Sequence, residues 1–309
     1  MADTPPLLFG ALPENHRSGF VAIIGKPNVG KSTLLNRWMG MKLAAVSPKP
    51  QTTRNRLLGI LSLPEAQVIF IDTPGIHQSR SKLGNYMVTT ALGALREADV
   101  VLFLVDSAEP PSKADETIAG YCAKTQAPVI LVLNKADVAA NPAAYQDYVA
   151  LGNWLHSTSI SALDGTGCAE LLDYTIGLLP NGPRYYPEDQ TTDQQERFIA
   201  AELVREQALR LLDQEVPHGL AVVVDEYKER ENGDVFISAT LLCEKDSHKG
   251  IVIGKGGAML KKIGKLARIE IEELIQTRIY LELWVKVRAN WRQDERILRD
   301  LGYSTPDED

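Results

Sequence analysis

The pattern of hydrophobic positions divides the chain into two regions that differ in their order of strands and helices. In the first region, short apolar runs alternate with amphipathic stretches of helical period. This alternation is typical of a doubly wound, mostly parallel α/β sheet, on which ligands bind at the carboxyl ends of the strands. The predicted strands are Phe20–Ile24, Val68–Ile71, Val100–Val105, Val129–Leu133 and Ser157–Ile160. The predicted helices lie near residues 31–40, 82–97, 112–125, 143–152 and 168–179.

The second region begins after a segment that fits neither period. Leu179–Pro187 holds three prolines and one glycine, which predicts a linker. Beyond it the pattern predicts a long helix, two strands joined at the Asn232-Gly233 turn, a helix pair broken by glycines, a third strand and a short helix. These elements cover residues 192–213, 220–228, 235–243, 247–275, 278–287 and 290–300. Since this α-β-β-α-α-β order is not doubly wound, we expect a separate α+β domain.

These breaks give the expected domain boundaries. We expect a Pro-rich flexible tail, an α/β domain, a linker, an α+β domain, and a C-terminal helix with an acidic tail. The corresponding residues are 1–18, 19–179, 180–191, 192–290 and 291–309.

Composition narrows the setting of the protein. Of the 309 residues, 44% are hydrophobic, which is enough for two globular cores. No apolar run approaches the ~18 residues of a membrane-spanning helix. The N-terminus lacks the basic region of a secretion signal. Cys122, Cys168 and Cys243 stand singly, as buried cysteines in a reducing compartment do. We therefore expect a soluble, cytoplasmic protein.

Charge is distributed unevenly along the chain. The net charge of −7 argues against wholesale coating of a nucleic acid. Residues 188–234 carry 13 acidic and 5 basic side chains, whereas residues 245–268 carry 7 basic side chains and one acidic, a net charge of +6. Because local charge sets where a polyanion docks, the second segment is a candidate nucleic-acid site.

The segment Gly25–Ser32 (GKPNVGKS) matches the phosphate-loop pattern GxxxxGK[ST], and it lies between a predicted strand and a predicted helix as that pattern requires. Gly25 and Gly30 allow the loop to curl so that its N–H groups face phosphate oxygens. The helix N-terminus adds a partial positive charge. Lys31 then reaches the β and γ phosphates, and the Ser32 hydroxyl ligates Mg²⁺.

Two motifs after later strands extend this site. In the DTPG motif, Asp72 suits a magnesium site and Gly75 can offer its N–H to a γ phosphate, although the motif alone is also typical of a turn. In the motif Asn134–Asp137 (NKAD), Asp137 can accept two hydrogen bonds from guanine. Adenine leaves that carboxylate unpaired, and such sites discriminate by ~10⁴–10⁵. Ser161–Leu163 fits a backbone contact to guanine O6.

A threonine in the loop Pro50–Arg54 (PQTTR) suits a switch that closes over Mg²⁺ when the γ phosphate is present, and an ordinary polar loop is the alternative. In the basic segment, Gly254–Gly257 is a GxxG loop between two predicted helices. A helix C-cap also explains such glycines, but KH domains use this loop to clamp about four nucleotides. Aromatic residues are scarce near the loop, so we expect Ile251, Ile253 and Ile263 to contact bases unless they belong to the core.

The order of these motifs resembles that of the Era family of GTPases. GKPNVGKS, QTTR, DTPGIH, NKAD and SAL match the family in the first region, and HKGIVIGKGGAMLKKIG and LELWVKV match it in the second. The resemblance covers about residues 19–290. It implies a P-loop GTPase domain followed by a type II KH domain. It further implies a ribosome-assembly factor that hydrolyses GTP and holds the 3′ end of 16S rRNA of the small (30S) subunit.

The resemblance also assigns roles to single residues. It implies that Thr53 is a magnesium ligand and that Asn28 takes part in binding K⁺ beside the phosphates. Ile76 stands where Ras-like proteins carry a water-orienting glutamine. Our hypothesis is that K⁺ neutralises charge in the transition state, as an arginine finger does. We expect His77 to be a solvent-exposed histidine of the switch, not a general base.

The expected site residues fall into three groups. The nucleotide contacts are Gly25, Lys26, Pro27, Asn28, Val29, Gly30, Lys31, Ser32, Thr33, Asp72, Thr73, Pro74, Gly75, Ile76, Asn134, Lys135, Asp137, Ser161, Ala162 and Leu163. The metal ligands are Ser32, Thr53 and Asp72 for Mg²⁺ and Asn28 for K⁺, and the catalytic residues are Lys31, Thr53 and Gly75. The RNA contacts are Lys249, Ile251, Ile253, Gly254, Lys255, Gly256, Gly257, Lys261 and Lys262.

The expected partners are 16S rRNA and the 30S subunit, with no DNA, at most peripheral association with the inner membrane, and a monomeric state. Two other classes of function compete with this prediction. One is an RNA chaperone with a vestigial G domain, against which the intact Lys31, Ser32, Asp72 and Asp137 argue. The other is a peripheral membrane or cell-cycle GTPase, against which the acidic balance and the lack of a basic amphipathic helix argue.

Overall fold

The computed structural model describes residues 12–79, 81–138 and 142–303, which form two compact units. The first unit comprises Met1–Gly40, Arg56–Thr73 and Leu92–Asp193. The second comprises Met41–Asn55, Pro74–Ala91 and Gln194–Asp309. The second unit therefore contains two segments, residues 41–55 and 74–91, that precede the predicted linker. We call them the loop 41–55 and the segment 74–91.

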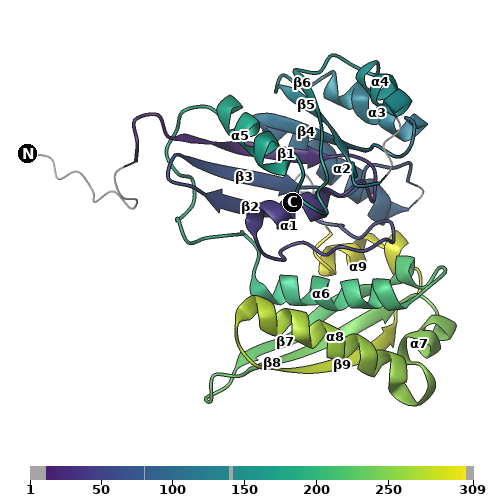
Figure 1. The fold of residues 1–309 in the computed structure, drawn as a ribbon. Helices are drawn as coiled ribbons and strands as arrows, with labels where there is room; N and C mark the ends of the chain where they lie inside the picture. Colours follow the sequence, from purple (N-terminus) through teal and green to yellow (C-terminus); the bar gives the residue numbers. More distant parts are fainter. Residues whose placement is uncertain (1–11, 80, 139–141, 304–309) are drawn as a thin grey trace, which may run out of the picture. The chain divides into compact units, whose positions relative to one another are not determined.

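The first unit is built on a six-stranded sheet with strand order β2-β3-β1-β4-β5-β6, in which only the β2–β3 pair is antiparallel (Figure 1). Helix α1 packs on β2 and β3, and α3 packs on β4. This arrangement confirms the predicted α/β class. The elements before the predicted linker are β1 (Arg17–Ile24), α1 (Lys31–Met39), β2 (Leu57–Ser62), β3 (Ala66–Asp72), α2 (Lys82–Glu97), β4 (Val100–Asp106), α3 (Lys113–Cys122), β5 (Val129–Asn134), α4 (Pro142–Val149), β6 (His156–Ser159) and α5 (Cys168–Leu178), and α2 is divided between the two units.

Strand β2 was not predicted from the sequence. Its residues, LLGILS, do not alternate in polarity, and no helix separates them from β3. The pairing of Leu57 with Asp72 explains the continuous apolar pattern, because this antiparallel edge strand is largely buried against β3. Strand β1 also begins earlier than predicted. Arg17 pairs with Ala66, so residues 17 and 18 belong to the sheet and not to a tail. Of that predicted tail, residues 1–11 lie outside the described residues.

The segment predicted as a linker packs against the first unit. The side-chain oxygen of Gln67 accepts hydrogen bonds from the N–H groups of Tyr185 and Tyr186, at 2.7 and 2.9 Å. The carbonyl of Thr191 accepts one from the N–H of Ile60 at 2.8 Å. These bonds satisfy backbone groups that the prolines leave without a helix or sheet partner. The segment is therefore fixed to the first unit as far as Thr191.

The second unit contains a three-stranded sheet of order β7-β8-β9, with β7 antiparallel and β9 parallel to β8 (Figure 1). Helices α6 and α8 pack on each other, α6 also contacts β7, and α8 also contacts β9. The predicted α-β-β-α-α-β order is confirmed. The elements are α6 (Glu196–Leu211), β7 (Ala221–Glu229), β8 (Val235–Cys243), α7 (Asp246–Ile253), α8 (Ala258–Ile275), β9 (Ile279–Val287) and α9 (Glu295–Asp300), with 3₁₀ turns at Pro217–Gly219, Lys255–Gly257 and Trp291–Gln293.

A small apolar core lies where strand β7 begins and strand β8 ends. Trp291 is fully buried, and its indole N–H donates to the Gly219 carbonyl at 2.9 Å. Around it lie side chains from α2, β7, β8 and α9, which explains why the start of α2 belongs to this unit. The buried members of the cluster are Leu83, Met87, Ala221, Leu242, Trp291 and Leu298. Among the described residues, no helix has the length and apolar character needed to cross a membrane.

Candidate functional site

The phosphate loop joins the end of β1 to the start of α1. Gly30 has a φ of 99°, and a Cβ at this position would lie 2.1 Å from Nδ2 of Asn134, so only glycine fits. The Asn134 amide donates from Nδ2 to the Val29 carbonyl at 2.7 Å and accepts at Oδ1 from the Ala162 N–H at 2.8 Å. Asn134 therefore ties the phosphate loop to the loop that contains the predicted guanine contacts.

Lys31 lies at the start of α1 and is 6% exposed. Its ammonium donates to the carbonyls of Gly25 and Lys26, at 3.3 and 2.9 Å. Burial lowers the pKa of Lys31 to about 8, and the Asp72 carboxylate opposes that shift. A buried cation whose hydrogen bonds go to carbonyls gains much from a strong anion such as a phosphate.

Two predicted magnesium ligands come together beside this lysine. The Ser32 hydroxyl at the start of α1 donates to Asp72 Oδ2 at the end of β3, at 2.7 Å. The Asp72 side chain is fully buried. The next residue, Thr73, donates from its hydroxyl to the Ile23 carbonyl at 2.7 Å, which fixes the end of β3 to β1. Two oxygen donors at a helix N-terminus, next to a lysine, are a suitable set for Mg²⁺ and phosphate.

The predicted guanine contacts lie at the carboxyl ends of β5 and β6. Asp137 is exposed and accepts a hydrogen bond from the Ser161 hydroxyl at 2.7 Å. From α1, Arg37 donates to the carbonyls of Ala162, at 2.7 Å, and Leu163. Sequence reasoning missed this role of Arg37, because nothing in the helical pattern distinguishes it from an ordinary surface arginine. Its effect is to hold the Ser161–Leu163 loop in place.

Two lysines predicted as nucleotide contacts are held by carboxylates of the same unit. The Lys26 ammonium lies 2.8 Å from Asp115, and the Lys135 ammonium lies 2.5 Å from Asp106. Lys135 has a φ of 70°, so the backbone turns sharply between Asn134 and Asp137. These pairs shape the two loops, and the aliphatic stems of the lysines remain available to pack on a ligand.

Thr53, Pro74, Gly75 and Ile76 belong to the second unit. Pro74, Gly75 and Ile76 are buried there, and Thr53 is half-buried. His77 is half-buried as well, so the expectation of a solvent-exposed histidine is wrong. Its ring hydrogen-bonds to the Gln51 side chain at 3.0 Å and to the Gly75 carbonyl at 2.9 Å, which joins the loop 41–55 to the segment 74–91.

The loop 41–55 is also bonded to the helices of the second unit. Arg54, only 1% exposed, donates to the carbonyls of Leu220 at 2.5 Å and His218 at 3.3 Å, and it lies 5.5 Å from the ring centroid of Trp291. Cations and carboxylates along α6 and α8 add further contacts. They are Lys42–Glu206 (2.8 Å), Lys42–Glu270 (2.8 Å), Lys49–Asp213 (2.7 Å), Arg210 with the Val46 carbonyl (3.1 Å) and Arg205 with the Thr52 carbonyl.

The GxxG loop lies between α7 and α8, as predicted. Gly254, Gly256 and Gly257 have φ values of 72°, 59° and 81°, a region in which other residues are strained. A Cβ on Gly256 or Gly257 would meet no atom within 4 Å, so the outer side of the loop is open to a ligand. Lys255 is exposed on the same turn.

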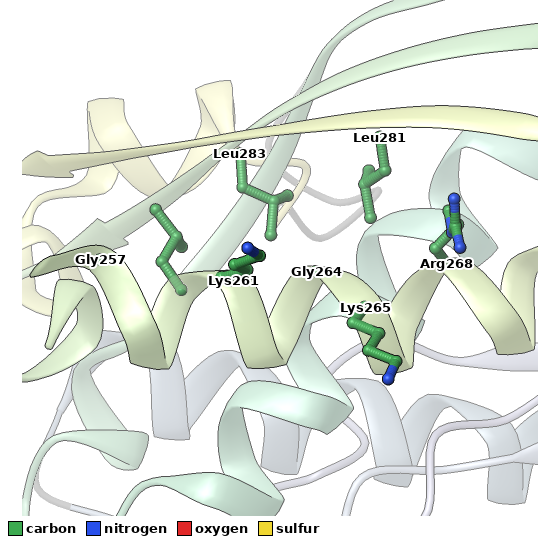
Figure 2. Close-up of a pocket in the computed structure, with 8 residues that line it drawn as sticks. Gly257, Lys261, Gly264, Lys265, Arg268, Leu281 and Leu283 are labelled. Atoms are coloured by element: carbon green, nitrogen blue, oxygen red, sulfur yellow. The ribbon is translucent and has the colours of Figure 1, made fainter.

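A groove of about 530 Å³ runs from this loop between α8 and β9 (Figure 2). Leu281 and Leu283 point from β9 toward α8 and form an apolar wall, while cationic side chains project from the helix. A Cβ on Gly264 would lie 3.3 Å from Leu283, so this glycine keeps the middle of the groove open. The lining residues are Gly257, Leu260, Lys261, Gly264, Lys265, Arg268, Leu281 and Leu283.

The residues predicted to contact RNA have different positions in the structure. Gly257 and Lys261 line the groove, and Ile251 is 49% exposed on α7. Ile263 is fully buried, so of the two alternatives left open for this residue, a place in the core is the one confirmed. Sequence reasoning missed Lys265 and Arg268. They share one face of α8 with Lys261 at spacings of four and three residues, and this helical period was the available signal.

The two sites define a class of protein: a P-loop GTPase domain joined to an RNA-binding KH domain. A family model described as 50S ribosome-binding GTPase matches residues 20–135, and a KH domain model matches residues 215–292. The chain belongs to the Era family of GTPases, which hydrolyse GTP. GTPase Era of Geobacter metallireducens is 52% identical over 292 residues, 93% of this chain and 98% of the relative. GTPase Era of Geotalea daltonii is 50% identical over 293 residues, 94% and 99% of the two chains.

Solved structures agree with this assignment. A structure of Era in complex with MgGDPNP and nucleotides 1506–1542 of 16S ribosomal RNA is 40% identical, with a TM-score of 0.89 over 94% of this chain and 100% of that one. A variant of Aquifex aeolicus Era bound to GDP·AlF₄⁻ is 40% identical with a TM-score of 0.87 over the same shares.

Proposed function

We propose that this chain is a GTP-hydrolysing switch that binds the single-stranded 3′ end of 16S rRNA during assembly of the 30S subunit. One observation carries the proposal: the same chain holds the Ser32–Asp72 pair beside Lys31 and a cationic groove along α8. The related Era complex contains both a magnesium-bound GTP analogue and a 16S rRNA fragment, which supports pairing the two ligands here.

At the nucleotide site, each group has a separate task. Lys31 binds the β and γ phosphates, and the N–H groups of the phosphate loop, with Gly75, surround the phosphate oxygens. Ser32 and Thr53 hold Mg²⁺, with Asp72 orienting its shell, and the ion supplies positive charge against the phosphates. Asp137, oriented by Ser161, reads the guanine N1–H and N2 amino groups. Retention of this set argues against a vestigial G domain.

We also propose that K⁺ assists hydrolysis at this site. Asn28 has a φ of 64° and is exposed on the phosphate loop, and Ile76 offers no group that polarises water. GTP turnover is expected to be faster in KCl than in NaCl. The upper limit for the ratio of the two rates is the ~10³–10⁵ that an arginine finger contributes. The Asn28→Ala variant is expected to lose the difference between the salts. Equal rates in KCl and NaCl for the unchanged protein would exclude this role.

At the RNA site, Lys261, Lys265 and Arg268 bind phosphates while the bases lie against Leu281 and Leu283. The GxxG loop approaches the RNA backbone closely because its glycines carry no side chains. A groove of this kind holds about four nucleotides. We propose that the protein works in the cytoplasm as a monomer and that any contact it makes with the inner membrane is peripheral.

Crosslinking tests the function as a whole. The protein is crosslinked to total RNA with and without a non-hydrolysable GTP analogue, and the attached RNA is sequenced. Crosslinks at the 3′ end of 16S rRNA that depend on the analogue are expected. Scattered crosslinks that ignore the nucleotide would contradict the switch. A phosphate-release assay excludes the chaperone alternative if GTP turns over, and flotation with anionic liposomes tests the membrane alternative.

A further inference from the structure

Strand β9 has two different faces. Leu281 and Leu283 line the groove, and the alternation of side chains along a strand places their neighbours Tyr280 and Trp284 on the opposite face of the sheet. Tyr280 is 60% exposed and Trp284 is 53% exposed. Large aromatic side chains that remain this exposed, four residues apart on one strand, mark a binding surface.

Neighbouring residues complete this face. Phe236 of β8 pairs with Tyr280 across the strands, and the two rings stack with centroids 5.9 Å apart. The guanidinium of Arg230 lies 5.2 Å from the Phe236 centroid and 5.4 Å from the Tyr280 centroid. One end therefore consists of two rings and a cation, and Trp284 lies roughly 13 Å along the strand. We call Arg230, Phe236, Tyr280 and Trp284 the aromatic platform.

Polar groups lie between the two ends of the platform. Ser238 is opposite Glu282, and Thr240 is opposite Trp284 and donates its hydroxyl to Asp225 at 2.6 Å. Ser238 and Thr240 are buried, whereas Asp225 is exposed and Glu282 is half-buried, so an apolar protein surface docked here would take two carboxylates out of water. Nucleic-acid bases suit this face better, since base edges donate hydrogen bonds to carboxylates while base faces stack on aromatic rings.

We propose that the aromatic platform is a second RNA site, which binds unpaired nucleotides that continue from the groove. Strand β9 is at the edge of the sheet, so an RNA strand leaving the groove reaches the platform without crossing another strand. Arg230 and the exposed Lys286 supply cations for its phosphates. This inference rests on the RNA binding proposed for the groove.

The sizes of the groove and of the known RNA support this continuation. The part of α8 that lines the groove, from Gly257 to Arg268, is roughly 16 Å long, which matches about four nucleotides. The rRNA fragment in the related Era complex is far longer. An RNA of that length extends beyond the groove, and the platform lies on the other face of the same strand.

The test compares two RNA oligonucleotides by fluorescence anisotropy. One has about four nucleotides and fills the groove, and the other carries about three more unpaired nucleotides at one end, with both ends tried. For the unchanged protein, the extension is expected to tighten binding roughly tenfold for each stacked base. Trp284→Ala is expected to bind the short RNA normally and to lose most of that gain. Trp284→Phe is expected to keep it.

Tryptophan emission gives a second measurement that does not depend on the alanine variant. Of the four tryptophans, Trp38 and Trp291 are buried and Trp154 is half-buried, so a base that stacks on Trp284 quenches the most exposed emitter. The longer RNA is expected to quench the emission and the short one to leave it unchanged. Trp284→Phe is expected to remove the quenching with affinity retained. Tyr174→Ala, which removes an aromatic ring 37% exposed on α5, is the control and is expected to change neither measurement.

The possible outcomes separate the proposals. The platform proposal would be overturned if the added nucleotides raise RNA affinity as much for Trp284→Ala as for the unchanged protein, and if the longer RNA does not quench Trp284 emission. A Trp284→Ala variant that binds both RNAs normally but loses affinity for the 30S subunit would also overturn it, because the face then contacts a protein. If the unchanged protein fails to bind the short RNA, the groove proposal fails instead.

Discussion

Asn134 uses one amide group to hold two loops. Its Nδ2 binds the Val29 carbonyl and its Oδ1 binds the Ala162 N–H, so both ends of the amide are engaged within the protein. A Cβ on Gly30 would collide with that amide at 2.1 Å. The asparagine of the NKAD motif therefore positions the phosphate loop against the Ser161–Leu163 loop, and we expect Asp137 to recognise the base.

The variant Asp137→Asn is expected to exchange guanine for xanthine specificity. The carboxylate accepts from guanine N1–H and N2, whereas an amide can donate to the carbonyl that xanthine carries at that position. GTP affinity is expected to fall by up to about 10⁴ and XTP affinity to rise. Equilibrium titrations with both nucleotides measure this change, and RNA affinity is expected to stay constant. A variant that still prefers GTP would contradict the assigned role.

Lys31 makes nucleotide affinity depend on pH. Burial lowers its pKa to about 8 in the free protein, and phosphates raise that pKa in the complex because they favour the charged form. Below the free pKa the lysine is charged in both states and affinity is constant. Above it, binding requires uptake of a proton, so GDP affinity is expected to fall by up to tenfold for each pH unit. Titrations over one unit on either side of pH 8 test this slope, and constant affinity would contradict it.

At the scale of elements, the GxxG turn allows a clean separation of the two activities. In Gly256→Asp, the new Cβ meets no atom within 4 Å, and the carboxylate places negative charge where an RNA backbone approaches. RNA affinity is expected to fall at least tenfold, with GTP turnover retained. Gly302→Asp is a matched control, since Gly302 also has a positive φ of 79° and open space around it, but follows α9. Equal RNA affinity in both variants would count against the loop.

The elements also show how far sequence patterns reach. The hydrophobic period was sufficient to predict the helices. The order of the motifs was sufficient to predict the Ser32–Asp72 pair, because the carboxyl ends of strands in a parallel sheet meet at one edge. Both signals were insufficient for β2, whose pairing partner is set by tertiary structure and not by its own pattern. They also left the place of Ile263 undecided, because a hydrophobic residue beside a binding loop has the same local pattern whether it faces the core or a ligand.

At the scale of the whole molecule, the division into two units does not follow the division into nucleotide and RNA functions. Thr53 and Gly75, which are expected to sense the γ phosphate, belong to the unit that holds the RNA groove. The loop 41–55 that contains Thr53 is bonded to α6, and it reaches α8 through the Lys42–Glu270 ion pair. Helix α8 in turn lines the groove. Within the second unit, the loop expected to sense the γ phosphate is therefore bonded to the helix that lines the RNA groove, and we expect the nucleotide state to act on RNA binding through these contacts.

Arg54 follows Thr53 directly and is buried in the second unit, where it contacts the Leu220 and His218 carbonyls and the Trp291 ring. A GTP analogue is expected to change RNA affinity, and RNA must change analogue affinity by the same factor, typically about 5–150-fold. In Arg54→Ala both factors are expected to fall together toward one, with a loss of about 2–4 kcal/mol in the free energy of unfolding.

Arg54→Lys guards against a poorly folded alanine variant, because it keeps the charge while losing the forked contact with two carbonyls. It is expected to lose part of the coupling and little stability. Arg56→Ala is the control, because Arg56 lies two residues after Arg54 and forms an exposed ion pair with Glu97. This variant is expected to retain the full coupling. Calorimetric titrations of RNA and analogue, each with and without the other, give both factors. If Arg54→Lys and Arg54→Ala couple the ligands as strongly as Arg56→Ala does, the signal passes outside the loop 41–55.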